Sequence, residues 1–136
     1  MKFWTIAVLL VLSFAMIASA GQPKVVKAEI NPAVAEPGET VVMMVEFTGK
    51  AKDIKEVSFV IREYLYDQPR RYLSPKKDSK KNIWVLEETI PYDAPYDIFS
   101  LDVRGLDSKG KEIVSKGLED NETGRTATTK LEIKDK

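Results

Sequence analysis

Cysteine and histidine are both absent from the chain of 136 residues. Their absence removes the usual ligands of zinc, copper and iron, the thiol nucleophile and the commonest general base. It also means that the hydrophobic core must stabilise the fold without disulfide bonds. We therefore expect no metal site and no cofactor, and we expect a protein that is not an enzyme.

An excess of charge of one sign is missing as well. The chain carries 21 lysine and arginine residues against 21 aspartate and glutamate residues, so its formal net charge is zero. A balanced composition gives no overall field that would hold a polyanion. The composition therefore disfavours nucleic-acid binding and adsorption to an acidic membrane as the main activity.

The N-terminus has the pattern of a secretory signal peptide. Lys2 provides a positive start, residues 3–17 are almost entirely apolar, and Ala18-Ser19-Ala20 supplies the small residues that signal peptidase accepts. We expect residues 1–20 to be removed and residues 21–136 to form one secreted, periplasmic or cell-surface domain. The alternative is an uncleaved N-terminal anchor, because the apolar stretch approaches the roughly 20 residues that span a bilayer.

The rest of the chain divides into short runs with the period of a β-strand. In Thr40 to Phe47 the odd positions Val41, Met43, Val45 and Phe47 form a continuous apolar face. The same reasoning predicts that each strand buries one face and leaves the other in solvent. Further strands are expected at Lys24 to Ile30, Lys55 to Tyr66, Arg71 to Leu73, Asn82 to Ile90, Tyr96 to Leu106 and Thr126 to Lys134.

Two turns carry clear signals. Pro37-Gly38 is placed as in a type II turn, where the glycine takes a positive φ. Asp107-Ser108-Lys109-Gly110 predicts a second turn, in which the aspartate bonds to the backbone ahead of it and the glycine takes a left-handed conformation.

These elements resemble the immunoglobulin-like and fibronectin-type-III-like domains of exported bacterial and archaeal proteins. The residues that carry the resemblance are Pro37-Gly38-Glu39-Thr40-Val41 before a hydrophobic strand, Trp84 before a proline-flanked turn, and Phe99-Ser100-Leu101-Asp102-Val103 before the turn at Asp107. The expected fold is all-β, a two-sheet antiparallel immunoglobulin-like sandwich of about seven strands. The chain departs from the family pattern at residues 67–82 and 111–125, and that pattern contains no catalytic residue.

The expected function is a non-catalytic binding module that presents loops and a sheet face to a protein partner or a cell-surface polymer, with residues 67–82 and 111–125 as the expected contact loops. Residues 67–82 form a basic connection, and aromatic side chains precede it. The candidate contact residues are Tyr64, Tyr66, Arg70, Arg71, Tyr72, Lys76 and Lys77.

Two other functions remain open at this point. Tyr64, Tyr66 and Tyr72, with the further aromatics Trp84, Tyr92 and Tyr96, could stack sugar rings as a carbohydrate-binding module, although Trp84 is expected in the core. Alternatively, open sheet edges could pair with another chain in a structural or assembly role.

Residues 119–123 contain a possible glycosylation site and several possible calcium ligands, in a segment expected to be an exposed loop. Asn121-Glu122-Thr123 is a formal N-glycosylation acceptor. Glu119, Asp120 and Glu122, or Asp107 in its turn, offer carboxylates to calcium, but without the spacing of a known calcium loop.

Signal-peptide cleavage gives the first testable prediction. Mass spectrometry of the protein exported by its own host is expected to find a mature chain that begins at Gly21, because the small residues of 18–20 fit signal peptidase. Recovery of the soluble protein inside the cell with Met1 still attached would contradict it.

Overall fold

The computed structural model describes residues 23–64, 68–113 and 127–135. Within these ranges the fold is all-β, as the sequence predicts, with two short 3-10 helices between strands. The elements are β1 (Val25–Asn31), β2 (Val34–Ala35), β3 (Thr40–Phe47), η1 (Ala51–Asp53), β4 (Ile54–Ile61), η2 (Arg62–Tyr64), β5 (Arg71–Tyr72), β6 (Ser74–Pro75), β7 (Asn82–Thr89), β8 (Asp97–Asp107), β9 (Glu112–Ile113) and β10 (Ala127–Ile133).

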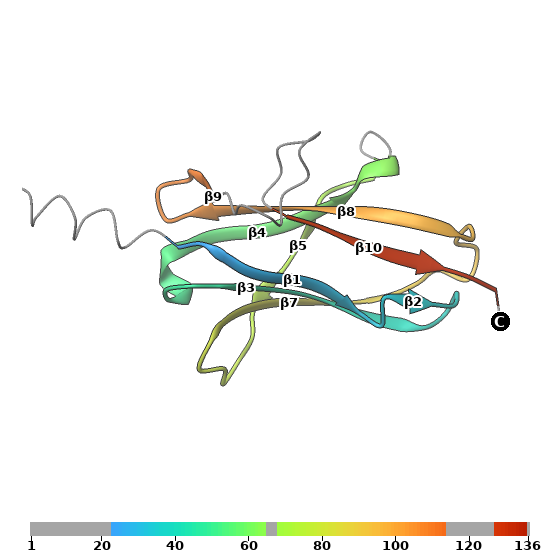
Figure 1. The fold of residues 1–136 in the computed structure, drawn as a ribbon, viewed down its shortest axis with the longest axis horizontal. Coiled ribbons are helices and arrows are strands. Elements are labelled where there is room, and N and C mark those ends of the chain that lie inside the picture. Colours follow the sequence, from blue (N-terminus) through green and yellow to red (C-terminus); the bar gives the residue numbers. More distant parts are fainter. Residues whose placement is uncertain (1–22, 65–67, 114–126, 136) are drawn as a thin grey trace, which may run out of the picture.

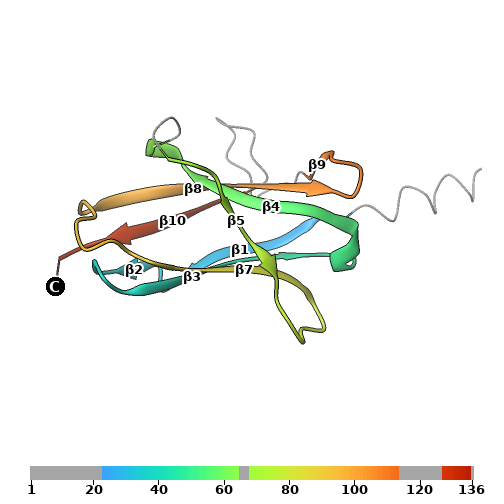
Figure 2. The same cartoon turned by 180° about the vertical axis from the view of Figure 1, so that it is seen from behind.

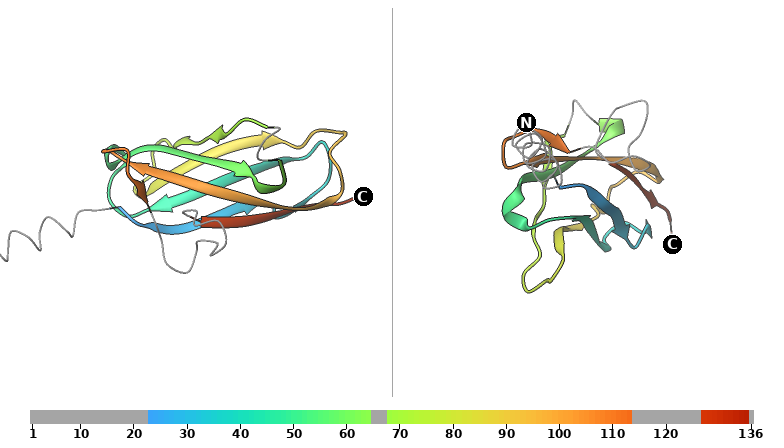
Figure 3. Two further views of the ribbon diagram at one scale, coloured as in Figure 1. Left: turned by 90° about the horizontal axis from the view of Figure 1, so that it is seen from above. Right: turned by 60° about the vertical axis from the view of Figure 1, so that its left-hand side comes forward.

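The strands form two sheets that face each other. One sheet has the order β1-β3-β7-β6, and the other has the order β2-β10-β8-β4-β5 with β9 paired to β8. Figure 1 shows the two layers from the side, with β4 and β8 above and β3 and β7 below. Seen from behind, the segment around β5 descends from the upper layer toward the lower one (Figure 2). The view from the left-hand side of Figure 1 shows the same two layers nearly end on (Figure 3).

One strand pair departs from the predicted antiparallel arrangement. β2 pairs with β10 in parallel, through Glu132 opposite Val34 and Ile133 opposite Ala35. β1 pairs antiparallel with β3 in the first sheet, whereas β2, which follows β1 in the chain, joins the second sheet next to β10. The expectation of a purely antiparallel sandwich is therefore wrong at this edge.

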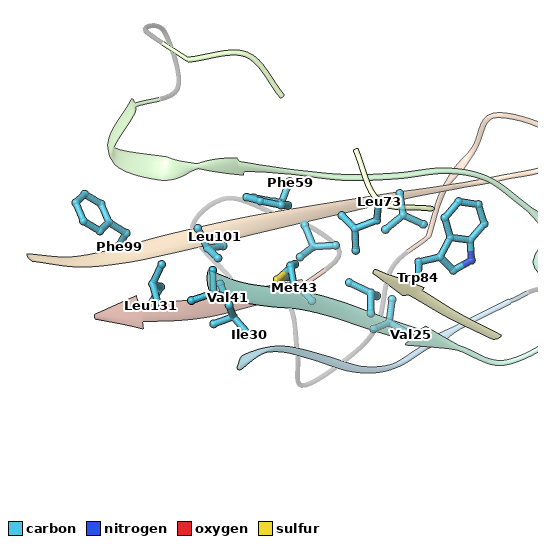
Figure 4. Close-up of a cluster of buried hydrophobic side chains, with 14 of the residues drawn as sticks. Val25, Ile30, Val41, Met43, Phe59, Leu73, Trp84, Phe99, Leu101 and Leu131 are labelled. Carbon is cyan, nitrogen blue, oxygen red and sulfur yellow. The ribbon is translucent and has the colours of Figure 1, made fainter. Parts of the chain in front are cut away.

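The inner faces of the sheets confirm the period-two pattern. Val41, Met43, Val45 and Phe47 of β3 are all buried, and so is the alternating set of β8 that includes Phe99. These side chains lie between the layers, where apolar contact stabilises the fold in proportion to the area removed from water. Figure 4 shows members of this cluster extending from Phe99 at one end to Trp84 at the other.

The prediction that each strand leaves one face in solvent is wrong for β4 and β8. β4 ends at Ile61 rather than at Tyr66, and its outward residues Ser58 and Val60 are buried. Asp102 of β8 also faces outward and has a relative exposure of 0%. Period two correctly separates the two faces of a strand, but it does not say what covers the second face.

Arginine side chains cover part of this outer face. Arg62 binds Asp102 through two hydrogen bonds, from Nε to Oδ2 at 3.0 Å and from Nη2 to Oδ1 at 2.8 Å. The hydroxyl of Thr128 donates to the same Oδ1 at 3.0 Å. Since Asp102 lies opposite Val60 on one side and Thr128 on the other, the network joins β4, β8 and β10.

Both predicted turns are confirmed. Gly38 has a φ of 91°, and the Glu39 N–H donates to the Glu36 carbonyl at 3.1 Å across the turn. Gly110 has a φ of 82°. Asp107 Oδ1 accepts hydrogen bonds from the backbone N–H groups of Lys109 and Lys111, each at 2.9 Å.

The predicted signal peptide (1–20), Tyr66 and Asn121 lie outside the described residues. In the three described ranges, no helix has the length and apolarity that crossing a membrane requires.

The buried ion pair on the outer face gives a stability prediction. Arg62→Met is expected to lower the free energy of unfolding by about 3–5 kcal/mol, because it leaves the buried Asp102 carboxylate without its charged partner. Urea denaturation followed by circular dichroism measures the change.

The matched control is Arg104→Met on β8, in the same sheet. Arg104 pairs with Glu56 at 3.0 Å, and both side chains are about one third exposed. Arg104→Met is therefore expected to lower the free energy of unfolding by no more than about 1 kcal/mol. Equal losses in the two variants would contradict a special role for the Arg62–Asp102 pair.

Candidate functional site

Three turns meet at the end of the sandwich where β1 begins and β3 and β8 end. They span residues 48–53, 76–81 and 108–111. The Ser108 N–H donates to the Asp53 carbonyl at 3.0 Å, which joins the first turn to the third. Lysines concentrate here, all of them exposed, and we call this region the lysine-rich end: Lys50, Lys52, Lys55, Lys76, Lys77, Lys80, Lys81, Lys109 and Lys111.

Aspartates fix the backbone of these turns. Asp107 accepts two backbone hydrogen bonds in the third turn, and Asp53 Oδ2 accepts one from the Lys50 N–H at 2.9 Å in the first. Aspartate favours such positions because its short side chain reaches nearby N–H groups. These carboxylates therefore hold turn geometry instead of pairing with lysine side chains.

A small depression lies between the first two turns. Its volume is about 220 Å³. Lys50 lies on one side of it, and Lys76, Lys80 and Lys81 belong to the other side. Positive side chains that converge on a concave surface concentrate the local field and attract anionic groups.

No ion pair between described residues involves a lysine of this end. Ion pairs seen elsewhere in the described part of the chain are Lys27–Glu29, Arg62–Asp102, Arg71–Glu88 and Arg104–Glu56. The lysine side chains of this end are therefore exposed and form no ion pair within the described part of the chain, while Asp53, Asp78, Asp107 and Glu112 in or next to the same turns reduce its net positive charge.

Carboxylates gather at the opposite end of the sandwich. That end contains the turn at Gly38, η2, the connection between β7 and β8, and the end of β10. Its acidic residues are Glu36, Glu39, Glu63, Glu88, Asp93, Asp97, Glu132 and Asp135, and they outnumber the basic residues Arg62, Arg71 and Lys134 of the same end. A chain with no net charge thus has an excess of lysine at one end and an excess of carboxylates at the other, which composition alone does not reveal.

The predicted basic contact residues do not act as one group. Arg70 is partly buried and its Nη1 donates to Ser58 Oγ at 3.1 Å. Arg71 forms an ion pair with Glu88 at 3.1 Å. Lys76 and Lys77 remain exposed in the second turn and belong to the lysine-rich end. The basic connection is therefore divided between residues that pack on the sandwich and residues that extend from it.

The predicted aromatic contact residues are also separated. Tyr64 is half-buried and stacks on Phe99 with ring centroids 5.7 Å apart. Tyr72 is 54% exposed on β5, while Trp84 is buried and donates from Nε1 to Asn82 Oδ1 at 3.0 Å. The core prediction for Trp84 is confirmed, so Trp84 cannot belong to an exposed stacking platform.

The two remaining tyrosines lie in the connection between β7 and β8. Tyr92 is 87% exposed and lies close to Gly38, where an added Cβ would be 2.6 Å from its Cε1. Tyr96 is 60% exposed, and its hydroxyl is 3.5 Å from Asp135 Oδ1. Both belong to the carboxylate-rich end and not to the lysine-rich end.

The calcium candidates cannot be placed together. Residues 119, 120 and 122 lie outside the described residues, and the carboxylate of Asp107 is engaged by backbone N–H groups. Within the described part of the chain, no group of three or more aspartate or glutamate side chains is arranged to hold a metal ion.

Seven lysines of this end were not among the predicted contact residues. They are Lys50, Lys52, Lys55, Lys80, Lys81, Lys109 and Lys111. Each lies within or next to a turn, and residues 48–53 and 107–111 are far from residues 76–81 in sequence. The sequence does show that lysine recurs at predicted turns. Which of these turns lie at the same end of the sandwich follows only from how the strands pair.

Comparison with known proteins defines no family for this chain. No family model and no curated protein sequence matches it. Among solved structures, it is similar to an alkylpurine DNA glycosylase of Pseudomonas fluorescens bound to DNA that contains an abasic site analogue, at 11% identity and a TM-score of 0.45. That alignment covers 85% of this chain but 31% of the glycosylase chain.

A second similar structure is a Niemann-Pick type C2 protein from the Japanese carpenter ant. The identity is 11% and the TM-score is 0.47, over 82% of this chain and 92% of that chain. Both scores describe only a distant likeness in the course of the backbone.

Proposed function

We propose that this protein is an exported, non-catalytic binding module of the immunoglobulin-like type, which contacts an acidic protein surface through its lysine-rich end. The observation that carries the proposal is the concentration of exposed lysines in three adjoining turns, none of which forms an ion pair with another described residue. Export is supported by the apolar N-terminal segment and the small residues at 18–20.

The strand order supports the immunoglobulin-like type. In such domains the first, second, fifth and fourth strands form one sheet, and the third, sixth and seventh strands form the other. If β1, β3, β4, β6, β7, β8 and β10 are taken as the seven principal strands, the two sheets have this membership. The remaining short strands β2, β5 and β9 are additions at the edges or at one end.

Loops at the end of such a sandwich are suited to binding because the sheets hold them in place. The first and third turns are fixed by aspartate hydrogen bonds, and the second follows β6, which pairs with β7. A turn whose backbone is already fixed loses less freedom on binding than a mobile segment, so more of the interaction energy contributes to affinity. Complementary charge also accelerates association.

An acidic protein surface fits this geometry better than a long polyanion. The lysines occupy one end of an elongated molecule and do not continue as a stripe along a sheet face, where Lys27 and Arg71 are paired with carboxylates. The opposite end is acidic and would repel the continuation of a bound polyanion.

Charge reversal tests the lysine-rich end. We expect Lys76→Glu/Lys80→Glu to weaken binding of a fluorescently labelled poly-L-glutamate at least tenfold at low salt, because both residues line the depression. Fluorescence anisotropy measures binding. Thermal melting is expected to change little, since both side chains are exposed.

The control is Lys130→Glu/Lys134→Glu on and just beyond β10, which makes the same change in net charge away from the lysine-rich end. It is expected to weaken binding less than threefold. Equal weakening by the two variants would reduce the effect to net charge and contradict the proposed surface. Preference for polyphosphate over poly-L-glutamate would contradict the choice of a protein partner.

A further inference from the structure

The space between the sheets contains a cavity at the carboxylate-rich end. Its volume is about 420 Å³, and residues of both sheets line it. The first sheet contributes Ile30, Val41, Met43 and Leu86, and the second contributes Phe59, Ile61, Phe99, Leu101, Leu131 and Ile133. We call this space the inter-sheet cavity. In Figure 4 the labelled members Phe99, Leu101, Leu131, Val41 and Ile30 lie together, away from Trp84.

Burial decreases along β4 and β7 at this cavity, whereas lining residues on β3, such as Met43, stay buried. On β4, inward-facing Val57 has a relative exposure of 0%, whereas Ile61, four residues along the same face, is only partly buried. On β7, Trp84 is buried and Leu86, the next inward residue, is only partly buried. Protein interiors hold few voids larger than a water molecule, so inward apolar residues that stay accessible indicate a space that packing leaves unfilled.

We propose that the inter-sheet cavity binds a small amphiphile with an apolar body and an uncharged polar end. Apolar side chains form most of its walls, and ligand sites for small molecules have this character at volumes of roughly 300–1,000 Å³. An apolar cavity of roughly 150 Å³ accepts benzene, so this cavity has room for a molecule about two to three times as large. The site is distinct from the lysine-rich end.

The polar residues of the cavity mark its mouth. Gln68, Arg71, Glu88 and Asp93 line it and come from chain segments at the open side of the sandwich. The two short strands stop there: β5 pairs only with Ser58 and Phe59 of β4, and β6 pairs only with Trp84 and Val85 of β7. Neither covers the end of β4 or of β7 that borders the cavity.

The Arg71–Glu88 ion pair connects the two sheets at this mouth. Arg71 belongs to β5 and Glu88 to β7, and the nitrogen-oxygen distance is 3.1 Å with side chains 48% and 33% exposed. While this pair is in place, Glu88 neutralises Arg71, and the remaining charged residue of the lining, Asp93, leaves the mouth negative. This charge disfavours a carboxylate ligand and favours an uncharged hydroxyl or amide end.

The test uses N-phenyl-1-naphthylamine, an uncharged apolar dye whose fluorescence rises in apolar surroundings. The protein of residues 21–136 is expected to bind it at a single saturable site. Decanol is expected to displace the dye at a concentration at least tenfold lower than decanoate, because of the charge at the mouth. Decanoate that competes as well as decanol would overturn the assignment of the polar end.

A plug variant locates the site. Ala94 is half-buried, lines the inter-sheet cavity and lies in the connection between β7 and β8 instead of in a strand. Ala94→Phe is expected to weaken dye binding at least tenfold by filling the space. Ala51→Phe makes the same change in an exposed turn at the lysine-rich end, and is expected to leave binding within twofold of the unchanged protein.

Methyl NMR tests the same site without a substitution, in case the plug variant does not fold. Met43 lines the inter-sheet cavity, while its neighbour Met44 lies on the other face of β3 and does not line it. Saturation with the dye is expected to shift the methyl resonance of Met43 and leave that of Met44 in place. Absence of saturable binding, or an unshifted Met43 resonance in the saturated protein, would overturn the proposal.

Discussion

Burial of alternate residues between two facing sheets is the constraint on which this fold depends. Without cysteine, no cross-link holds the layers together, so the inner faces of β3 and β8 must supply the cohesion. Val45 and Val103, each with a relative exposure of 0%, mark the part of the core where the contact is complete. Packing differs between the two ends of the sandwich. Side chains fill the space between the sheets at the lysine-rich end, whereas the other end contains the inter-sheet cavity.

Side chains also pack and form hydrogen bonds on the outer face of the second sheet. Asp102 is removed from water by Arg62 and Thr128, and Ser58 is bonded by Arg70. This use of arginine explains why the basic connection of residues 67–82 does not form one contact surface. Its first part crosses the open side of the sandwich and packs there, and its last part extends from the lysine-rich end with exposed side chains.

The two proposed sites follow from how the strands end. At the lysine-rich end, tight turns between long paired strands bring residues from distant parts of the sequence together, as the Ser108–Asp53 hydrogen bond illustrates. At the other end, β5 and β6 are too short to cover the side between β4 and β7, so apolar residues such as Ile61 and Leu86 stay partly accessible. One end therefore offers charge to a partner surface, and the other offers an apolar interior to a small molecule.

The sequence by itself determined the all-β class, the inward face of β3, and the turns at Gly38 and Gly110, because each depends on residues close together in the chain. It also identified Lys76 and Lys77 as exposed basic residues. Tertiary structure alone decided the parallel pairing of β2, the burial of Asp102 on the outer face, the separation of charge within a neutral chain, and the inter-sheet cavity. These features depend on which strands become neighbours, and a local pattern of apolar and polar residues carries no information about that.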